Sequence, residues 1–228
     1  MVGTVHEPFT LALPFEGRWL TENSPARRVP SHGTDLLGGR YAIDFVGVDD
    51  RRRTSIRNDW RTAFSTEPVD RFFAFGRPIL APLAGMVVRV HDGEPDHEAR
   101  RSQFTLVSYA LGQAARLREG VASIAGNYVV IAAGPAEYVA LVHLRKGSLN
   151  VTVGDTVAAG QFLGECGNSG NSTQPHVHLQ VMDSLDLATA HGIPLAFERF
   201  REWPRGASRA LLRESGVPAE GAVVEPVR

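Results

Sequence analysis

The sequence predicts a mainly β fold, an antiparallel sandwich or barrel-like sheet with a few short helices. Short Val-rich runs follow one another closely in the second half of the chain, and Gly or Asn separates them. The chain also has 23 Gly and 14 Pro among 228 residues, a high proportion of turn formers. Short strands joined by such turns are typical of antiparallel sheets. With 43% hydrophobic and 21% charged residues, the composition is that of a globular protein with a well-packed core.

The first 76 residues predict two strands and long irregular segments. Residues 1–39 are rich in Pro, Gly, Ser and Thr, and we interpret them as an irregular N-terminal segment with one short strand near 9–13. Residues 41–48, YAIDFVGV, predict a buried strand that contains one acid. The Arg-rich residues 49–76 predict a solvated loop with a helical turn.

The pattern changes at residue 77, where strands become frequent. RPILAPLAGMVVRV predicts a Gly turn followed by a strand, and residues 91–126 are interpreted as a polar insertion with one helix over 106–119. Further strands are expected at 127–132, 138–143, 150–153, 161–166 and 176–182. The tail, 188–228, predicts a helical stretch near 197–201 and an irregular end. The expected organisation is therefore a β domain over 40–187, flanked by the N-terminal segment and the tail.

Composition and charge exclude several classes of partner. The formal net charge of −1 indicates neither a nucleic-acid nor an anionic-membrane partner. Cys166 is the single cysteine, which rules out an intrachain disulfide, and we interpret it as a small core residue. We expect no signal peptide and no transmembrane segment within these residues. Localisation and oligomeric state stay unknown from the sequence.

Two histidines in the run HVH form the first candidate for chemistry. On a strand, alternate side chains point to the same face, so His176 and His178 lie side by side while Val177 points away. One imidazole can bind a metal while the other transfers a proton. The alternative is a pair of surface histidines on an edge strand.

Two further residues stand out by their position in apolar runs. His143 ends the run YVALVH, where a strand end commonly contributes to an active site, although it can also be an ordinary hydrogen-bonded histidine. Asp44 lies inside YAIDFV, and a carboxylate there needs a metal, a hydrogen bond or an ion pair, for which Arg40 is a ready partner.

Taken in this order, the motifs resemble the lysostaphin/LytM-type zinc metalloendopeptidases. The similarity covers about residues 40–181, with the insertion outside it, and its most specific part runs from GDTVAAGQ through GNSGNST to HVH over 154–180. The resemblance implies the duplicated hybrid motif fold, one zinc ion (Zn2+) and a peptide substrate in the cross-links of bacterial peptidoglycan. Members of this family are usually exported.

The resemblance also implies roles for individual residues. In the family, the His and Asp of H-x-x-x-D and the second His of H-x-H hold zinc, which corresponds here to Asp44 and His178. The other two histidines, His143 and His176, would flank the zinc-bound water as catalytic residues. Asn168 and Asn171, in the GNSGNST turn, are expected to bind or modulate the substrate.

One family ligand position differs in this chain, because Arg40 stands four residues before Asp44 where the family has His. Arg offers no lone pair to a metal. Three alternatives follow: His32 completes the ligand set from the upstream loop, zinc is held by two protein ligands and water, or Arg40 pairs with Asp44 in a metal-free relative. We expect residues 40 and 44 to share one face of a strand, so that Arg40 modulates activity.

Two other functions fit parts of the sequence. The first is a catalytically degenerate domain that binds wall peptide or regulates another hydrolase. The second is a swinging-arm carrier domain, indicated by the Gly-Asp and Gly-Gln turns, but the single lysine, Lys146, lies before those turns. His91 and His97, in the acidic stretch HDGEPDHE, are interpreted as part of a solvated loop rather than as a second metal site.

Overall fold

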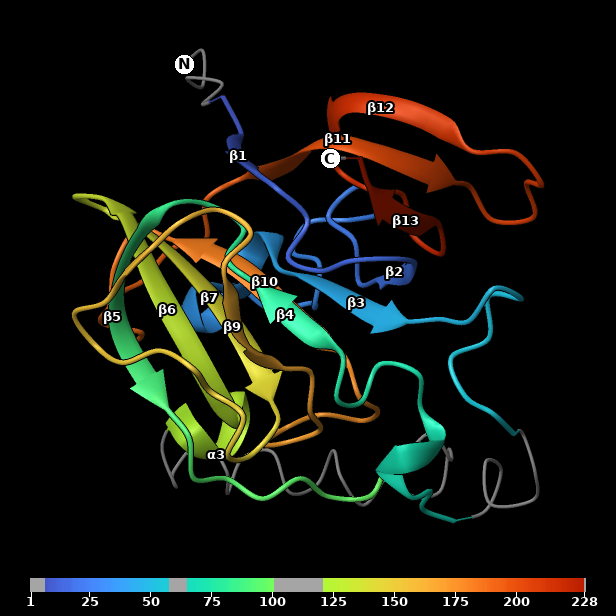
Figure 1. The fold of residues 1–228 in the computed structure, drawn as a ribbon. Helices are drawn as coiled ribbons and strands as arrows, with labels where there is room; N and C mark the ends of the chain where they lie inside the picture. Colours follow the sequence, from blue (N-terminus) through green and yellow to red (C-terminus); the bar gives the residue numbers. More distant parts are fainter. Residues whose placement is uncertain (1–6, 58–64, 101–120, 228) are drawn as a thin grey trace.

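The computed structural model describes residues 7–57, 65–100 and 121–227, and these residues form a mainly β fold (Figure 1). The strands are β1 Phe9–Leu11, β2 Trp19–Glu22, β3 Ile43–Gly47, β4 Pro78–Leu80, β5 Gly85–His91, β6 Asn127–Gly134, β7 Glu137–Leu144, β8 Thr156–Val157, β9 Phe162–Glu165, β10 Val177–Met182, β11 Leu195–Trp203, β12 Leu211–Gly216 and β13 Val223–Pro226. The described helices are η1 Leu36–Tyr41, η2 Val69–Arg71 and α3 Val121–Ala125. The helix expected over 106–119 lies outside the described residues.

One large sheet dominates the molecule. Its order is β1-β11-β13-β2-β3-β10-β7-β6-β5-β8, and β12 pairs with β11 outside this path. The described pairings are antiparallel except that of β1 with β11, which is parallel. A second sheet consists of β4 and β9 and lies in front of the large sheet in Figure 1.

The two faces of the large sheet differ in character because side chains alternate along each strand. On β10, Val177, Leu179 and Val181 are almost fully buried and belong to the main core, which also includes residues of β4 and β9. His178 and Gln180 point to the opposite face and are only partly buried. That opposite face carries the candidate site.

Strands from the two chain ends pair within the same large sheet as the central part. Phe15 and Trp19 stack with ring centroids 4.6 Å apart, and Phe45 of β3 packs edge-on against Phe197 of β11 at 5.4 Å. The N-terminal segment contributes two strands instead of the one expected. The helical stretch expected near 197–201 is wrong, because this segment is β11.

The error in the tail has a physical cause. Arg and Glu are good helix formers, but Phe197 and Phe200 are both fully buried and β11 pairs with three other strands. Packing and strand pairing therefore override the local preference. The strand expected at 150–153 is likewise absent, since this segment leads into a turn and the next strand is β8.

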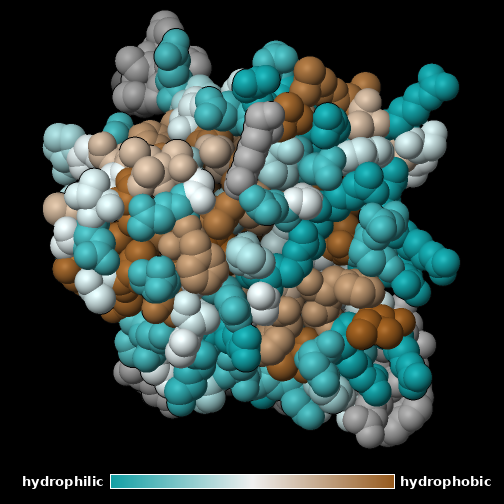
Figure 2. Space-filling view, in the orientation of Figure 1, coloured by the Kyte–Doolittle hydropathy of each residue, from teal (hydrophilic) through white to brown (hydrophobic). Residues whose placement is uncertain are grey.

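The surface shown in Figure 2 mixes polar and apolar side chains, with brown patches interrupted by teal ones. Within the described parts of the chain, no helix combines the length and the apolar character that crossing a membrane requires.

Candidate metal centre

Two candidate ligands lie opposite each other on neighbouring strands. Asp44 of β3 is the direct register partner of His178 of β10, and both side chains point to the open face of the sheet. His178 Nδ1 is 2.8 Å from Asp44 Oδ1. Asp44 is only 6% exposed, so its charge depends on these neighbours for compensation.

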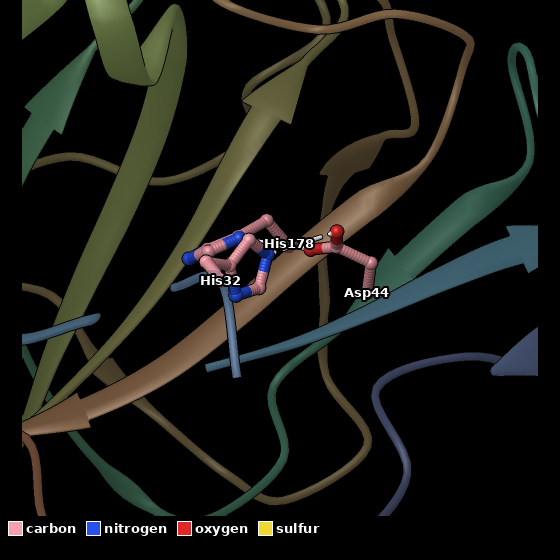
Figure 3. A group of neighbouring side chains, drawn as sticks. All are labelled: His32, Asp44 and His178. Atoms are coloured by element: carbon pink, nitrogen blue, oxygen red, sulfur yellow. Dashed lines mark hydrogen bonds and ion pairs between the residues drawn. The ribbon is translucent and has the colours of Figure 1, made fainter. Parts of the chain in front are cut away.

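A third candidate ligand reaches this pair from a loop. His32 Nε2 lies 3.0 Å from Asp44 Oδ2, on the other oxygen of the same carboxylate. One potential ligand atom from each of His32, Asp44 and His178 lies within 4.8 Å of the others (Figure 3). Two imidazole nitrogens and one carboxylate oxygen are a donor set suited to catalytic zinc, which leaves a fourth position for water or substrate.

Neighbouring amides fix the orientation of two of these side chains. Gln180 donates from Nε2 to the carbonyl oxygen of Leu37 at 2.8 Å, which turns its Oε1 towards His178 Nε2 at 3.1 Å. His178 therefore carries a proton on Nε2, and its Nδ1 is the nitrogen that faces Asp44. Asn23 donates from Nδ2 to Asp44 Oδ2 at 2.7 Å. Neither amide is predicted from the sequence, although Gln180 shares the face of His178 by simple alternation.

The two candidate catalytic histidines lie beside this cluster. The ring centroids of His143 and His176 are 4.8 Å apart, and those of His143 and His178 are 6.0 Å apart. His176 Nε2 is 3.7 Å from Asp44 Oδ1. The structure therefore brings together the five residues His32, Asp44, His143, His176 and His178.

Backbone carbonyls determine the protonated nitrogen of both histidines. His143 Nδ1 lies 3.0 Å from the carbonyl oxygen of Ser169, and His176 Nδ1 lies 2.7 Å from that of Gln174. A carbonyl oxygen only accepts, so Nδ1 carries the proton in each ring and Nε2 is left with a lone pair. His143 also has a positive φ of 65°, which is uncommon for a residue other than Gly.

Burial and neighbouring groups shift the pKa values of Asp44 and of three histidines of the cluster in different directions. Burial by itself would raise the pKa of Asp44, but His176, His178 and His32 outweigh it and hold that pKa well below its usual value. Burial lowers the pKa of His178, but the hydrogen bond to Asp44, the charge of Asp44 and the hydrogen bond to Gln180 together outweigh it, and the net shift is upward. Burial and the neighbouring histidines lower the pKa of His143 well below its usual value. Burial also lowers that of His176.

Arg40 is placed differently from what the sequence indicated. It lies in the 3-10 helix η1, not on a strand shared with Asp44, and its Nη1 contacts Asp35 Oδ1 at 2.7 Å and Oδ2 at 2.8 Å. The Arg40–Asp44 pair, one of the three alternatives, is therefore not formed, and the expectation that both residues share a strand face is wrong. Helix η1 ends before β3 begins, so the four-residue spacing between Arg40 and Asp44 does not place their side chains on one face of a strand.

The two asparagines of the GNSGNST turn have different surroundings. Asn168 is fully buried, and its Nδ2 donates to the carbonyl oxygen of His97 at 2.6 Å. It is therefore inaccessible to substrate. Asn171 lines a cleft beside the metal cluster. His97 Nε2 contacts the carbonyl oxygen of Gly170 at 2.9 Å, so the stretch expected to be solvated is tied to this turn.

Other residues singled out by the sequence lie outside the cluster. Cys166 is fully buried, and burial raises the pKa of its thiol. His91 contacts Glu94 Oε1 at 3.1 Å and stacks on Tyr128. In the described residues, the metal-capable group is the one formed by His32, Asp44 and His178.

Comparison with known proteins gives matches over the part of the chain that carries most of these residues. The model of "Peptidase family M23" matches residues 66–189. Lysostaphin of Staphylococcus staphylolyticus is 47% identical over 57 residues, which are 25% of this chain and 11% of lysostaphin. The match thus spans about a tenth of that relative.

Solved structures are similar at lower identity. The catalytic domain of lysostaphin from Staphylococcus simulans is 20% identical, with a TM-score of 0.37 over 70% of this chain and 86% of that one. A mutant catalytic domain of the prophage-encoded M23 protein EnpA from Enterococcus faecalis is 19% identical, with a TM-score of 0.38 over 67% and 73% of the two chains.

Proposed function

The chain belongs to peptidase family M23, and we propose that it is a zinc-dependent metalloendopeptidase that cleaves peptide cross-links of bacterial peptidoglycan. The observation that carries this proposal is the cluster of His32, Asp44 and His178 with two further histidines beside it. A structural ion pair would need one histidine next to Asp44, whereas here three imidazoles lie within 4 Å of its carboxylate oxygens.

The residues present fit one zinc ion. His32 Nε2, His178 Nδ1 and an oxygen of Asp44 would hold it, and the amide of Gln180 supports the required tautomer of His178. When bound, zinc lowers the pKa of a coordinated water to about 7 and polarises a carbonyl oxygen. This assignment makes His32 the ligand that replaces the family His at the position of Arg40.

His143 and His176 supply the proton chemistry in this proposal. Each is held through Nδ1 by a backbone carbonyl, so each presents an Nε2 lone pair. Their lowered pKa values keep both rings neutral near pH 7, which suits acceptance of a proton from water and its return to the leaving amine. The short distance between the rings allows both to act on the same substrate group.

The alternative, a catalytically degenerate domain, depended on Arg40 neutralising Asp44. The guanidinium instead pairs with Asp35, and Asp44 accepts from Asn23 and faces His32 and His178. The geometry therefore favours the enzyme over the degenerate relative.

Metal analysis combined with a cleavage assay tests the proposal. The purified protein should bind one zinc per chain, and zinc should restore, after chelation, the release of new amino termini from purified peptidoglycan. His176→Ala should keep zinc and lose most of the cleavage, while His191→Ala, at a side chain 85% exposed, is the matched control. Zinc binding without any cleavage of wall peptide would favour the degenerate alternative.

A further inference from the structure

A cleft adjoins the candidate metal centre on the open face of the large sheet. It has a volume of about 420 Å3, and His32, His143 and His178 line one end of it. This volume lies within the range of small-ligand pockets, roughly 300–1,000 Å3. The cleft extends from these histidines across β7 and β6 towards β5.

Apolar side chains form most of this cleft. Its floor includes Val130, Ala140, Val142 and Met182, which belong to a small second core cluster. Its rims carry Leu36 of η1, which is 65% exposed, and Val121 of α3, which is 38% exposed. Large apolar residues exposed on both rims of a cleft that leads to a reactive site indicate that an apolar group of the substrate covers them.

The charged side chains that line the cleft also limit which ligands it can bind. No Asp or Glu lines it among the described residues, whereas Arg89 of β5 does. Arg89 is exposed and makes no hydrogen bond or ion pair within the described part of the chain. An exposed guanidinium at the end of a cleft whose described lining contains no acid suits a carboxylate.

The strand register gives the distance between these two features. Gln180, Ala140, Val130 and Arg89 are successive register partners on β10, β7, β6 and β5. Neighbouring strands lie about 4.8 Å apart, so Arg89 lies about 14 Å from the strand that carries His178. An extended peptide covers this distance with about four residues.

We propose that the substrate of this site is an anionic peptide with a large apolar side chain near the scissile bond. Its carboxylate lies three to four residues from that bond. The proposal rests on the proposed function for metal-dependent cleavage and for the position of the scissile bond, but not for the Gly- and Ala-rich wall cross-link as the substrate. The apolar side chain occupies the cleft between α3 and β7, and the carboxylate pairs with Arg89. A peptide of glycine alone leaves the apolar floor and both rims uncovered.

Peptide binding to the chelator-treated protein tests this proposal without cleavage. The probes are fluorescein-labelled Gly-Gly-Leu-Gly-Glu with an amidated end, the same peptide with Gly for Leu, and the same peptide with Gln for Glu. A further pair, ending in Gln with a free or an amidated C-terminus, distinguishes a terminal carboxylate from an acidic side chain. Fluorescence polarisation should give at least a tenfold lower Kd with Leu than with Gly, which corresponds to about 1.4 kcal/mol.

Two variants with matched controls locate the effect. Ala125→Phe, at a half-buried position of α3 that lines the cleft, should remove the preference for Leu, whereas Ala136→Phe, exposed in the turn between β6 and β7, should keep it. Arg89→Gln should remove the preference for the carboxylate, whereas Arg209→Gln, also exposed, should keep it. Circular dichroism verifies that each variant is folded.

The outcomes separate this inference from the proposed function. Equal binding of the Leu and Gly peptides to the wild type overturns the inference even if peptidoglycan is cleaved. An Ala125→Phe variant that keeps the full preference for Leu overturns it as well. Selective binding of the Leu peptide by a protein that cleaves nothing upholds the inference and removes the proposed function.

Discussion

Of the three candidate ligands, Asp44 and His178 lie on strands and form the strand half of the metal centre. His32 lies in a loop and forms its loop half. Asp44 and His178 are direct partners in the β3–β10 ladder, so the backbone hydrogen bonds of the sheet determine their separation. His32 lies in a loop that the backbone N–H of Ser31 ties to the carbonyl oxygen of Arg40 at 3.0 Å. Arg28 adds a hydrogen bond from Nε to the carbonyl oxygen of Ser31 at 3.1 Å.

The two halves place their side chains by different means. In the ladder, two residues are positioned by a repeating pattern that needs no particular neighbouring side chain. In the loop, the position of one imidazole depends on individual hydrogen bonds within the loop and to the following helix η1. We therefore expect the strand half to be the stronger part of the metal site and the loop half to be the more easily displaced.

Removal of the carboxylate in the strand half should have the largest effect. Asp44→Asn keeps the shape of the side chain but removes the one negative charge that faces three imidazoles. We expect zinc affinity to fall by more than the roughly 10–100-fold that loss of an outer partner costs, and cleavage to be abolished. Zinc competition with a chromophoric chelator measures the change.

Asp183→Asn is the control for Asp44→Asn. Asp183 contacts His191 near the surface, away from the metal cluster, so zinc affinity should be unchanged. A stoichiometric, tightly bound zinc in Asp44→Asn would falsify the ligand assignment.

Loss of the loop ligand should have the next largest effect. In His32→Ala, Asp44 and His178 still form a two-ligand site on the ladder, so zinc should bind more weakly, by about 100-fold or more, at or above the upper end of the range for outer partners, rather than not at all. The same chelator competition, together with metal content after dialysis, measures this. If zinc content and affinity stay at wild-type values, His32 is not a ligand and the loop half of the site has to be reassigned.

The same division explains which parts could be predicted from the sequence. Apolar runs correctly indicated β3 and β7, and the run from HVH onward correctly indicated β10, although that strand begins at Val177, directly after His176. The mainly β fold followed from the spacing of short apolar runs. These features repeat locally, so a single sequence contains enough information to recognise them.

The features that depend on tertiary contacts were harder to predict. His32 lies twelve residues before Asp44, and nothing in SHGTDLLGG shows that its loop turns back onto β3. Asn23 contacts Asp44 from a still earlier segment. In the tail, the segment near 197–201 was predicted as helix from its Arg and Glu residues, although its two Phe residues are buried in β11. The rest of the tail was predicted to be irregular, although it contains β12 and β13.

Loss of a side chain that orients a strand ligand should lower zinc affinity less than loss of a ligand does. Gln180→Leu removes the oxygen that faces His178 Nε2 and leaves the tautomer and the ring orientation less defined. We expect zinc affinity to fall by about tenfold, at the low end of the range for outer partners. Gln161→Leu, at an exposed turn residue outside the cleft, is the matched control. An unchanged affinity would mean that the ladder alone fixes His178.

The smallest effect on zinc affinity and cleavage is expected from loss of the Arg40 side chain, although the sequence indicated that this residue modulates activity. Its guanidinium points to Asp35 on an exposed surface, and exposed ion pairs contribute little. Its contribution to the loop half comes from its backbone carbonyl oxygen, which accepts from the N–H of Ser31, and every residue type offers that oxygen. Arg40→Ala should therefore change zinc affinity and cleavage by less than about threefold.

Arg40→His provides the sharper version of this test, because it introduces the residue type that the sequence resemblance implies at this position. If His32 already fills the ligand position, the new imidazole has no place in the cluster, and zinc affinity should stay within about threefold of the wild type. The double variant His32→Ala with Arg40→His should then be as weak as His32→Ala alone. A large gain in affinity in either Arg40→His variant would show that residue 40 can reach Asp44 after all, and that the loop half of the site has two alternative arrangements.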